Sequence, residues 1–540
     1  MFGLFSIEQS NAQVTQEWVA IYSTPIYSNI ANSIAVDNSG NVYVTGQADA
    51  GNFNSYDYAT IKYNSSGIQQ WVQRYNGPGQ GNDYAYSIAV DRSGNVYVTG
   101  WSWGKGTNFD YATLKYNSSG ILQWVQRYNG PVNNRDGANS MAIDDSGNVY
   151  VTGVSYRSGL GIYDDYTTIK YNSAGDSIWV RRYNGPGNWY DGANSIAVDG
   201  SGSVYVTGYS AIASGSNYDY ATIKYNTGGD SIWVRRYNGP VNGYDYAYSI
   251  AVDGSSNVYV TGYSWGGGTN YDYATLKYNS SGAQQWVQRY NGTGNREDYT
   301  KSIAVDRLGN AYVTGVSYGS GTDSDYATIK YNSTGVQQWV QRYNGTGNSK
   351  DYARSMALDS SGNVYVTGWS VGIGTIYDYA TIKYNTAGIQ EWVQRYNGTE
   401  NYFDGANSIV VDVSGNVYVT GSSATGAPLP YYRYATIKYS QMVGIQPISN
   451  EIPEEYNLFQ NYPNPFNPNS KIKFQISKLS DVKLNVFDIR GREIIILVNE
   501  VLKPGTYEAE ISGENYPSGI YFYRLQTEKY NQTLKMSLIK

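Results

Sequence analysis

Carboxylate side chains recur at fixed spacing along most of this chain, and they are the groups best placed to do chemistry. The 540 residues include neither His nor Cys, which excludes imidazole bases, thiol nucleophiles and the usual zinc ligands. Carboxylates alone still permit glycoside hydrolysis, which uses a pair of them, and calcium binding, which uses oxygen ligands. These two kinds of chemistry therefore frame the search for a site.

Two sets of aspartates recur once in almost every repeat of the sequence. The first set opens the segment DYATIKY and its variants, and the second set precedes the segment SIAV and its variants. Sevenfold recurrence favours an architectural role, because an acid–base pair needs two carboxylates in different environments. The first set is Asp57, Asp110, Asp165, Asp219, Asp272, Asp325 and Asp378; the second is Asp83, Asp136, Asp191, Asp245, Asp298, Asp351 and Asp404, with Asn29 in the first unit.

A third group of aspartates lies in short turns such as Asp37-Asn38-Ser39-Gly40-Asn41. Oxygens at alternate positions are a feature of calcium loops, but the later acidic ligand of such a loop is missing. Asp and Asn also stabilise tight turns by bonding nearby backbone N–H groups. We therefore interpret the turns as structural and expect no cofactor, with calcium as the alternative.

The aspartates are positioned by a repeat that fills residues 13–440. Its unit includes SIAVDRSGNVYVTG, residues 87–100, in which period-2 alternation around a Gly/Asn turn predicts two paired strands. Each unit carries four strand-like phrases, which is typical of a β-propeller blade. A solenoid is the alternative, but four strands per repeat and the lack of capping repeats argue against it. The anchor tryptophans, spaced 53 to 55 residues apart and interpreted as packing residues, are Trp18, Trp71, Trp124, Trp179, Trp233, Trp286, Trp339 and Trp392.

The phase of the repeat predicts an all-β propeller of eight four-stranded blades. The repeat region begins with one outer strand and ends with three inner strands, so the N-terminal strand would complete the eighth blade and remove an exposed sheet edge. An Arg follows the anchor Trp by three positions in seven units, whereas Ile21 stands there in the first. Arg433 replaces the strand-opening Asp in the last unit. We therefore predict cross-strand Asp–Arg pairs, with Ile21 and Arg433 in one closing blade.

The segment between the second and third strands varies in length and should share one rim with the blade-to-blade connections. Such variable loops are where binding usually takes place. Exposed flat rings there would stack on sugars, whereas buried rings would only separate the blades. Packing is the alternative for this candidate ligand-binding rim of Trp101, Trp103, Trp189, Trp265 and Trp369, to which Tyr209 is added.

The two ends of the chain differ from the repeat. Residues 1–12 read as a truncated signal peptide, with a disordered tail as the alternative. Residues 441–452 read as a linker. From residue 453 to 540 Lys, Ile and Glu become more frequent and Gly less so, and short alternating strands predict a small β-sandwich.

Both regions resemble known families. The phrases SIAVDxSGNVYVTG, DYATIKYNSSG and QQWVQRYNG are similar to the SBBP class of bacterial β-propeller repeats, which implies a propeller fold and export but no defined activity. The C-terminal part resembles the type IX secretion sorting domain, which implies an address read by the secretion machinery and a secreted or outer-membrane surface location. The residues that carry this second resemblance include Asn464, Pro465, Phe466, Asn467, Pro468, Gly491, Gly505, Gly519 and Lys535.

The sequence as a whole predicts an exported, non-catalytic binding or surface-scaffold propeller with a glycan or surface protein as ligand. The alternative is a polysaccharide-binding or polysaccharide-degrading enzyme that uses rim carboxylates and aromatics. An enzyme would need acidic residues unique to one or two blades, for which Glu297 and Glu400 are loop-tip candidates. A net charge of −6 with scattered charges argues against a nucleic-acid partner. No long apolar run predicts a transmembrane segment.

Overall fold

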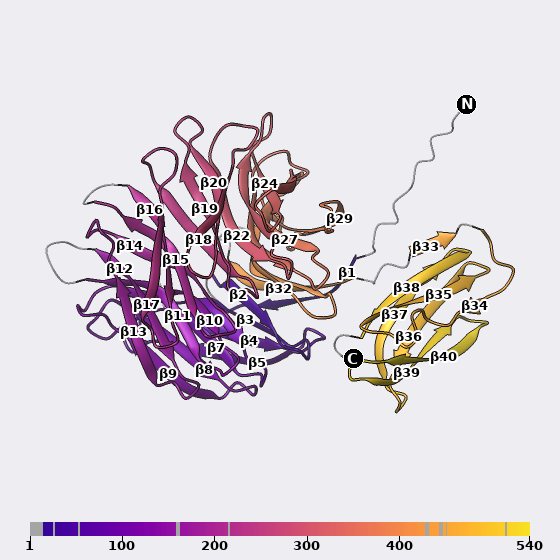
Figure 1. The fold of residues 1–540 in the computed structure, drawn as a ribbon. Coiled ribbons are helices and arrows are strands. Elements are labelled where there is room, and N and C mark those ends of the chain that lie inside the picture. Colours follow the sequence, from indigo (N-terminus) through magenta and orange to yellow (C-terminus); the bar gives the residue numbers. More distant parts are fainter. Residues whose placement is uncertain are drawn as a thin grey trace. The chain divides into compact units, whose positions relative to one another are not determined.

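The computed structural model describes residues 14–24, 28–51, 55–157, 163–213, 217–426, 431–441, 446–449, 451–513 and 516–540. The signal peptide predicted for residues 1–12 lies outside these ranges. The described chain forms two compact units, one spanning Gln16–Lys438 and the other containing Tyr439–Lys540. Both units are built from β-strands (Figure 1).

The first unit is a β-propeller whose described residues form eight four-stranded sheets (Figure 1). Blade 1 consists of β2 (Ile30–Val36), β3 (Val42–Asp49), β4 (Tyr56–Tyr63) and β5 (Gln69–Tyr75), and blade 2 of β6 (Asp83–Val90), β7 (Val96–Trp103), β8 (Phe109–Tyr116) and β9 (Leu122–Tyr128). Blade 3 consists of β10 (Asp136–Ile143), β11 (Val149–Tyr156), β12 (Asp164–Tyr171) and β13 (Ser177–Tyr183), and blade 4 of β14 (Asp191–Val198), β15 (Val204–Ala211), β16 (Tyr218–Tyr225) and β17 (Ser231–Tyr237). Blade 5 consists of β18 (Asp245–Val252), β19 (Val258–Trp265), β20 (Tyr271–Tyr278) and β21 (Gln284–Tyr290), and blade 6 of β22 (Asp298–Val305), β23 (Ala311–Tyr318), β24 (Ser324–Tyr331) and β25 (Gln337–Tyr343). Blade 7 consists of β26 (Asp351–Leu358), β27 (Val364–Ser370), β28 (Asp378–Tyr384) and β29 (Gln390–Tyr396), and blade 8 of β30 (Asp404–Val411), β31 (Val417–Ala424), β32 (Tyr432–Gln441) and β1 (Val14–Tyr22).

The N-terminal strand closes the eighth blade, as the repeat phase predicts. The strand order of that sheet is β1-β32-β31-β30, so Ile21 on β1 and Arg433 on β32 belong to one blade. In the other seven blades the predicted Asp–Arg pairs are present, with N–O distances of 2.7 to 3.3 Å. Blade number, closure and cross-strand pairing are thus confirmed.

The first strand of every blade lines the axis of the propeller. Each of these strands contacts the first strand of both neighbouring blades, which gives a closed inner ring of β2, β6, β10, β14, β18, β22, β26 and β30. Each also carries a β-bulge where it pairs with the second strand; in β6 the register shifts between Ala85 and Ser87. A bulge adds one residue that has no cross-strand partner and so re-aims a side chain.

Tyrosines and tryptophans join neighbouring blades, which accounts for their abundance. The hydroxyl of Tyr58, a fully buried residue, donates to the backbone oxygen of Ala112 in the next blade at 3.3 Å. The indole N–H of Trp71 likewise donates to the backbone oxygen of Ser118 in the next blade, at 3.3 Å. A large ring with one polar atom fills the space between two sheets and still satisfies its hydrogen-bonding group.

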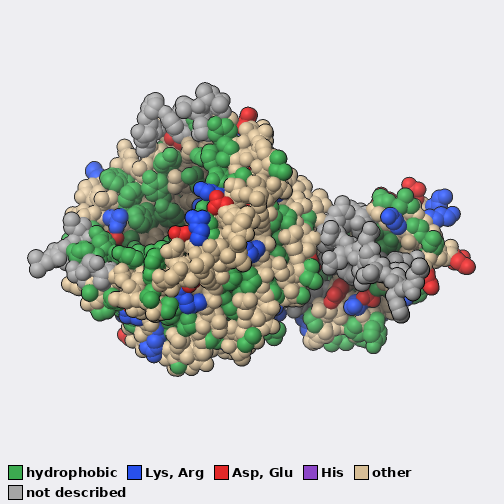
Figure 2. Space-filling view, turned by 90° about the horizontal axis from the view of Figure 1, so that it is seen from above, with side chains coloured by type: hydrophobic (Ala, Val, Ile, Leu, Met, Phe, Trp, Pro, Cys, Tyr) green, Lys and Arg blue, Asp and Glu red, His purple; other side chains and the backbone are tan. Residues whose placement is uncertain are grey.

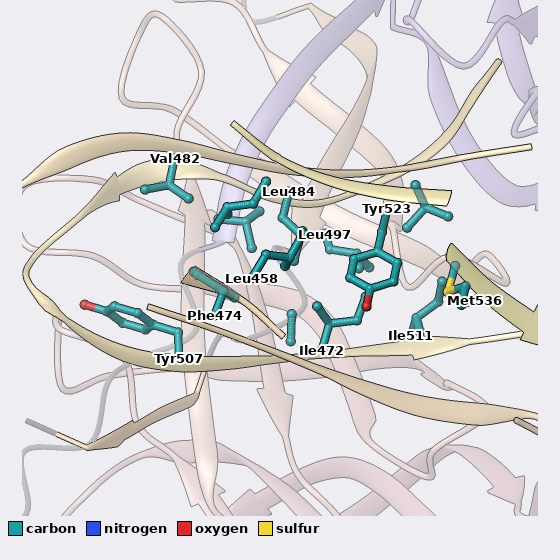
Figure 3. Close-up of a cluster of buried hydrophobic side chains, with 14 of the residues drawn as sticks. Leu458, Ile472, Phe474, Val482, Leu484, Leu497, Tyr507, Ile511, Tyr523 and Met536 are labelled. Atoms are coloured by element: carbon teal, nitrogen blue, oxygen red, sulfur yellow. The ribbon is translucent and has the colours of Figure 1, made fainter. Parts of the chain in front are cut away.

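The second unit is a small β-sandwich, as predicted. One sheet has the order β33-β38-β35-β34 and the other β37-β36-β39-β40. Figure 3 shows the core between them, with Phe474 and Ile472 facing Leu484 and Tyr523. The strands are β33 (Gln446–Ser449), β34 (Asn457–Leu458), β35 (Asn469–Ile476), β36 (Ser480–Phe487), β37 (Glu493–Leu502), β38 (Gly505–Ser512), β39 (Gly519–Gln526) and β40 (Asn531–Leu538).

Part of the stretch predicted as a linker is an edge strand of this sandwich. β33 pairs with β38, and Pro447 lies opposite Tyr507. Pro lacks a backbone N–H, so it is accommodated at a sheet edge and not in a central strand.

Candidate functional site

The two rims of the propeller are built differently. On one rim, the loop between the second and third strands runs beside the connection from the previous blade: the N–H of Gly79 donates to Trp103 O, and the N–H of Trp103 donates to Asn82 O, both at 3.2 Å. We call this the variable rim. The opposite rim, which we call the fixed rim, carries the turns between first and second strands and between third and fourth strands.

The second aspartate set fastens the connections to the variable rim. Asp83 Oδ2 accepts a hydrogen bond from the N–H of Gly77 at 2.8 Å, and Oδ1 accepts one from Trp103 at 3.0 Å. The equivalent glycine contact recurs in six other blades. Burial raises the pKa of Asp83 to about 6, against the lowering effect of its hydrogen bonds. These carboxylates have the architectural role that their recurrence favours.

Each aspartate of the first set forms an ion pair with an arginine of the same blade. Asp110 Oδ2 lies 2.7 Å from Arg127 Nη2, and the same nitrogen donates to the backbone oxygen of Ser102 at 3.0 Å. Each arginine thereby ties the outermost strand to the second and third strands of its own blade. Both aspartate sets therefore have structural partners in every blade that carries them.

On the fixed rim, the aspartate that opens each first-to-second-strand turn binds backbone N–H groups of that turn, as Asp91 shows. Asp91 Oδ1 accepts the N–H groups of Ser93 and Asn95, each at 2.9 Å. Its Oδ2 accepts the amide of Asn95 at 2.8 Å and the hydroxyl of Tyr97 at 3.0 Å. Four donors on two oxygens explain why the turn has one length in every unit. The described residues contain no cluster of acidic side chains arranged to hold a metal ion.

The five candidate tryptophans are all half-buried, and neighbours cover part of each ring. Trp101 lies against Gly137 of the next blade, where a Cβ would come within 2.3 Å of the indole. The Trp369 ring stacks on Tyr352 with centroids 4.0 Å apart, and Trp189 lies 3.9 Å from Tyr163. Trp103 and Trp265 cover glycines of the preceding connection in the same way. Packing is therefore one role of these rings, and their contact with a ligand stays a prediction.

A cavity of about 320 Å³ opens on the variable rim beside the axis. It draws on blades 3, 4 and 5 and includes the predicted rim residue Tyr209 but none of the five tryptophans. Figure 2 shows the propeller hollowed, with hydrophobic side chains over much of the wall and charged side chains grouped at the border. The cavity is lined by Arg135, Asp164, Tyr190, Asn194, Tyr209, Tyr218, Tyr246 and Tyr248.

One ion pair sets the charge of this cavity. Arg135 Nη2 contacts Asp164 Oδ2, and the guanidinium also lies 5.9 Å from the centre of the Trp101 ring. Asp164 is 3% exposed, and its Oδ1 has no hydrogen-bond partner among the described residues. Burial raises the pKa of Asp164, against the opposing pull of Arg135.

Sequence reasoning missed Arg135 and Asp164, although a signal was present. The residue before the strand-opening aspartate is aromatic in most blades, as in Tyr56, Phe109 and Tyr218, but acidic in blade 3. An acidic residue unique to one blade is the feature that distinguishes a site from architecture.

In the C-terminal unit, the sorting motif around Phe466 is hydrogen-bonded to the last residues of the chain, and we call this contact the clasp. The backbone of Phe466, whose ring is buried, donates to Ser537 O at 3.0 Å and accepts from the N–H of Ile539 at 3.0 Å. Asn464 Oδ1 accepts the N–H of Ser537 at 3.0 Å. Pro465, Asn467 and Lys535 are exposed around this clasp, Pro468 accepts the N–H of Gly513, and Gly491, Gly505 and Gly519 lie in a turn or begin strands.

Family models match both units. The beta-propeller repeat matches residues 17–54, 70–110, 123–160, 232–269, 285–321 and 338–373. The secretion system C-terminal sorting domain matches residues 460–540. The chain thus contains beta-propeller repeats and a C-terminal secretion sorting domain. This domain indicates secretion across the outer membrane or attachment to the surface, and it implies interaction with the type IX secretion machinery. Among the described residues no helix has the length and hydropathy to cross a bilayer.

Individual relatives are distant. An uncharacterized WD repeat-containing protein of Acanthamoeba polyphaga mimivirus is 22% identical, and the match covers 75% of this chain but 30% of that protein. PorZ, a surface component of the type-IX secretion system of Porphyromonas gingivalis, is 14% identical over 95% of this chain and 75% of its own, with a TM-score of 0.33. The propeller domain of the Trilobed protease of Pyrococcus furiosus is 9% identical over 69% and 95%, with a TM-score of 0.37.

Proposed function

We propose that this protein is an exported, non-catalytic binding module that takes a saccharide in the tyrosine-walled cavity of the variable rim. The cavity carries the proposal: its volume of about 320 Å³ lies within the roughly 300–1,000 Å³ typical of ligand pockets. Tyrosine rings offer flat apolar faces for sugar rings and hydroxyls for hydrogen bonds. The sorting domain would deliver this module to the cell exterior.

The charges in the cavity support binding over catalysis. Glycoside hydrolysis generally requires two carboxyl groups facing each other across the bond to be broken. Among the described lining residues Asp164 is the one acid, and it is paired with Arg135. The raised pKa of Asp164 would suit a general acid, so a degrading enzyme remains the second candidate.

A glycan array probed with the full-length protein tests the proposal. Tyr246→Ala, which removes a ring from the cavity wall, should weaken binding about tenfold, because one stacked ring contributes on the order of 1 kcal/mol. Tyr84→Ala is the matched control, since Tyr84 holds the same register position in blade 2 outside the cavity. Equal losses in both variants, or no bound glycan, would contradict the proposal.

Each glycan that binds on the array should then be incubated in solution with the protein, and the mixture should be assayed for new reducing ends. We expect no cleavage. Cleavage that disappears in Asp164→Asn, with binding retained, would establish the enzyme in place of the binding module.

A further inference from the structure

The bulged residue of each innermost strand forms a ring around the propeller axis. It is the position at which the register with the second strand shifts. From blade 1 to blade 8 the ring reads Asn32, Tyr86, Asn139, Asn194, Tyr248, Lys301, Arg354 and Asn407. Its composition is far less regular than the rest of the strand.

Asparagine at this position ties one blade to the next. The side-chain amide of Asn194 donates to the backbone oxygen of Ala247 at 2.8 Å. The other three asparagines make the equivalent bond at 2.8 to 2.9 Å. Asparagine is thus the residue that the architecture uses at the bulge.

Blades 2, 5, 6 and 7 depart from this pattern, and the last three of them are consecutive. The Lys301 Nζ lies 4.2 Å from the centre of the Tyr248 ring. Burial and the neighbouring charge of Arg354 lower the pKa of Lys301 to about 8. Desolvation lowers the pKa of Arg354, and Tyr326 and Tyr352 oppose that effect. No carboxylate within the described residues acts on the pKa of either cation.

Lys301 is half-buried, whereas Arg354 is exposed, and two like charges without an anion beside them repel each other. The four asparagines show that the architecture does not need a charge there. Tyr248 is also a wall of the cavity, and its ring is the group that Lys301 contacts. At the other end, the pairing of Arg135 with Asp164 leaves that end without a free charge.

We propose that Tyr248, Lys301 and Arg354 form an anion subsite of this cavity, which receives the carboxylate or sulfate of an acidic saccharide. The inference rests on the proposed function and names its ligand class. The planar guanidinium of Arg354 suits two-point contact with an oxyanion, and the ammonium of Lys301 adds a second charge-assisted hydrogen bond. Tyr248 supplies the ring face beside them.

Titration calorimetry of the full-length protein with matched hexasaccharides tests the subsite. The probes are an oligogalacturonate for carboxylate, a heparin fragment for sulfate, and maltohexaose as the neutral arm. We expect one anionic probe to bind more tightly than the neutral one, with an affinity that falls as salt rises.

The variants Lys301→Asn and Arg354→Asn install the residue that four other blades use, so the ring should fold. Each should weaken the anionic probe about tenfold and leave the neutral arm unchanged. Lys105→Asn, which removes an exposed charge from the blade 2 loop, is the control and should alter neither.

The outcomes separate the two claims. Neutral binding equal to anionic binding, unaffected by the asparagine variants, would overturn the anion subsite and leave the proposed function intact. No binding in any saccharide arm would overturn both. A hexaglutamate peptide that binds in place of the saccharides, and is lost in the asparagine variants, would overturn the saccharide assignment.

Discussion

The two rims of the propeller are made from the same eight units, but they differ in how many of their polar groups have hydrogen-bond partners within the fold. On the fixed rim, the aspartate that opens the turn has both oxygens filled by hydrogen-bond donors, as at Asp91. On the variable rim the aspartate set around Asp83 holds the loops, but Oδ1 of Asp164, like Oδ1 of every aspartate in the first set, has no hydrogen-bond partner within the described residues. Recurrent chemistry here is structural, and chemistry that departs from the repeat is the candidate for function.

The largest difference should come from two glycines with the same backbone conformation. Gly120 on the fixed rim has a φ of +83° and lies 2.8 Å from the Trp71 ring when a Cβ is added, whereas Gly106 on the variable rim has a φ of +79° and nothing within 4 Å. Gly120→Ala should cost about 3 kcal/mol, because strain adds to overpacking. Gly106→Ala should cost about 1 kcal/mol from strain alone.

Denaturant unfolding of both variants measures these costs. Equal losses would show that the fixed rim tolerates change as well as the variable rim does. The two rims would then differ in sequence variability but not in how much a substitution lowers the free energy of unfolding.

The next effect concerns the turn carboxylate itself. Asp91→Ala removes four hydrogen bonds and leaves the buried hydroxyl of Tyr97 without its acceptor. We expect a loss of about 2 kcal/mol in the free energy of unfolding. Asp145→Ala on the same rim is the control: its ion pair with Arg92 joins two side chains that are each 80% exposed, so the loss should stay within about 0.5 kcal/mol. A turn that holds calcium would instead show a metal-dependent melting temperature that Asp91→Ala abolishes.

The two rims should also respond to pH in opposite directions. Burial raises the pKa of Asp245 to about 6, so this group binds its proton more tightly in the folded state. Its contribution to stability is complete below about pH 4, where an unfolded aspartate also binds its proton, and is lost as pH rises through about 6. At Asp199 on the fixed rim, burial opposes but hydrogen bonds prevail and lower the pKa to about 2. That contribution is present above about pH 4 and is lost as pH falls toward 2.

Denaturant unfolding between about pH 3 and pH 8 separates the two contributions. Asp245→Asn should reduce the loss of stability between about pH 4 and pH 7 by on the order of 1 kcal/mol. Asp145→Asn controls for the removal of one exposed charge. An unchanged slope in Asp245→Asn would mean that the variable-rim carboxylates are not the groups that titrate.

Most of the fold could be predicted because a period identifies residues that share an environment. The joint exceptions Ile21 and Arg433 even indicated which strands close the ring. The strand β33 was missed because Pro447 marks a loop unless the sheet edge is known.

The cavity could not be predicted in the same way. Its lining comes from three blades, and residues such as Arg135 and Tyr248 meet through the curvature of the ring. The bulge also interrupts the period-2 alternation, so Lys301 and Arg354 could not be assigned to the axis from spacing. Emphasis on tryptophans led the sequence interpretation to rings that the structure places against glycines and tyrosines.

The smallest effect concerns the one blade that lacks an Asp–Arg pair near the variable rim. Arg433 Nε is buried without a hydrogen-bond partner in the described part of the chain, and Ile21 is 41% exposed. Installing the pair as Ile21→Arg with Arg433→Asp should raise the free energy of unfolding by about 0.5 kcal/mol, because an exchange of sites restores the arrangement of the other blades. Each single change should be neutral or destabilising, so a double-mutant cycle measures the coupling between the two sites. A coupling of zero would show that the pairs on this rim follow from the repeat without stabilising it, and would leave the Asp83 set as the main support of the variable rim.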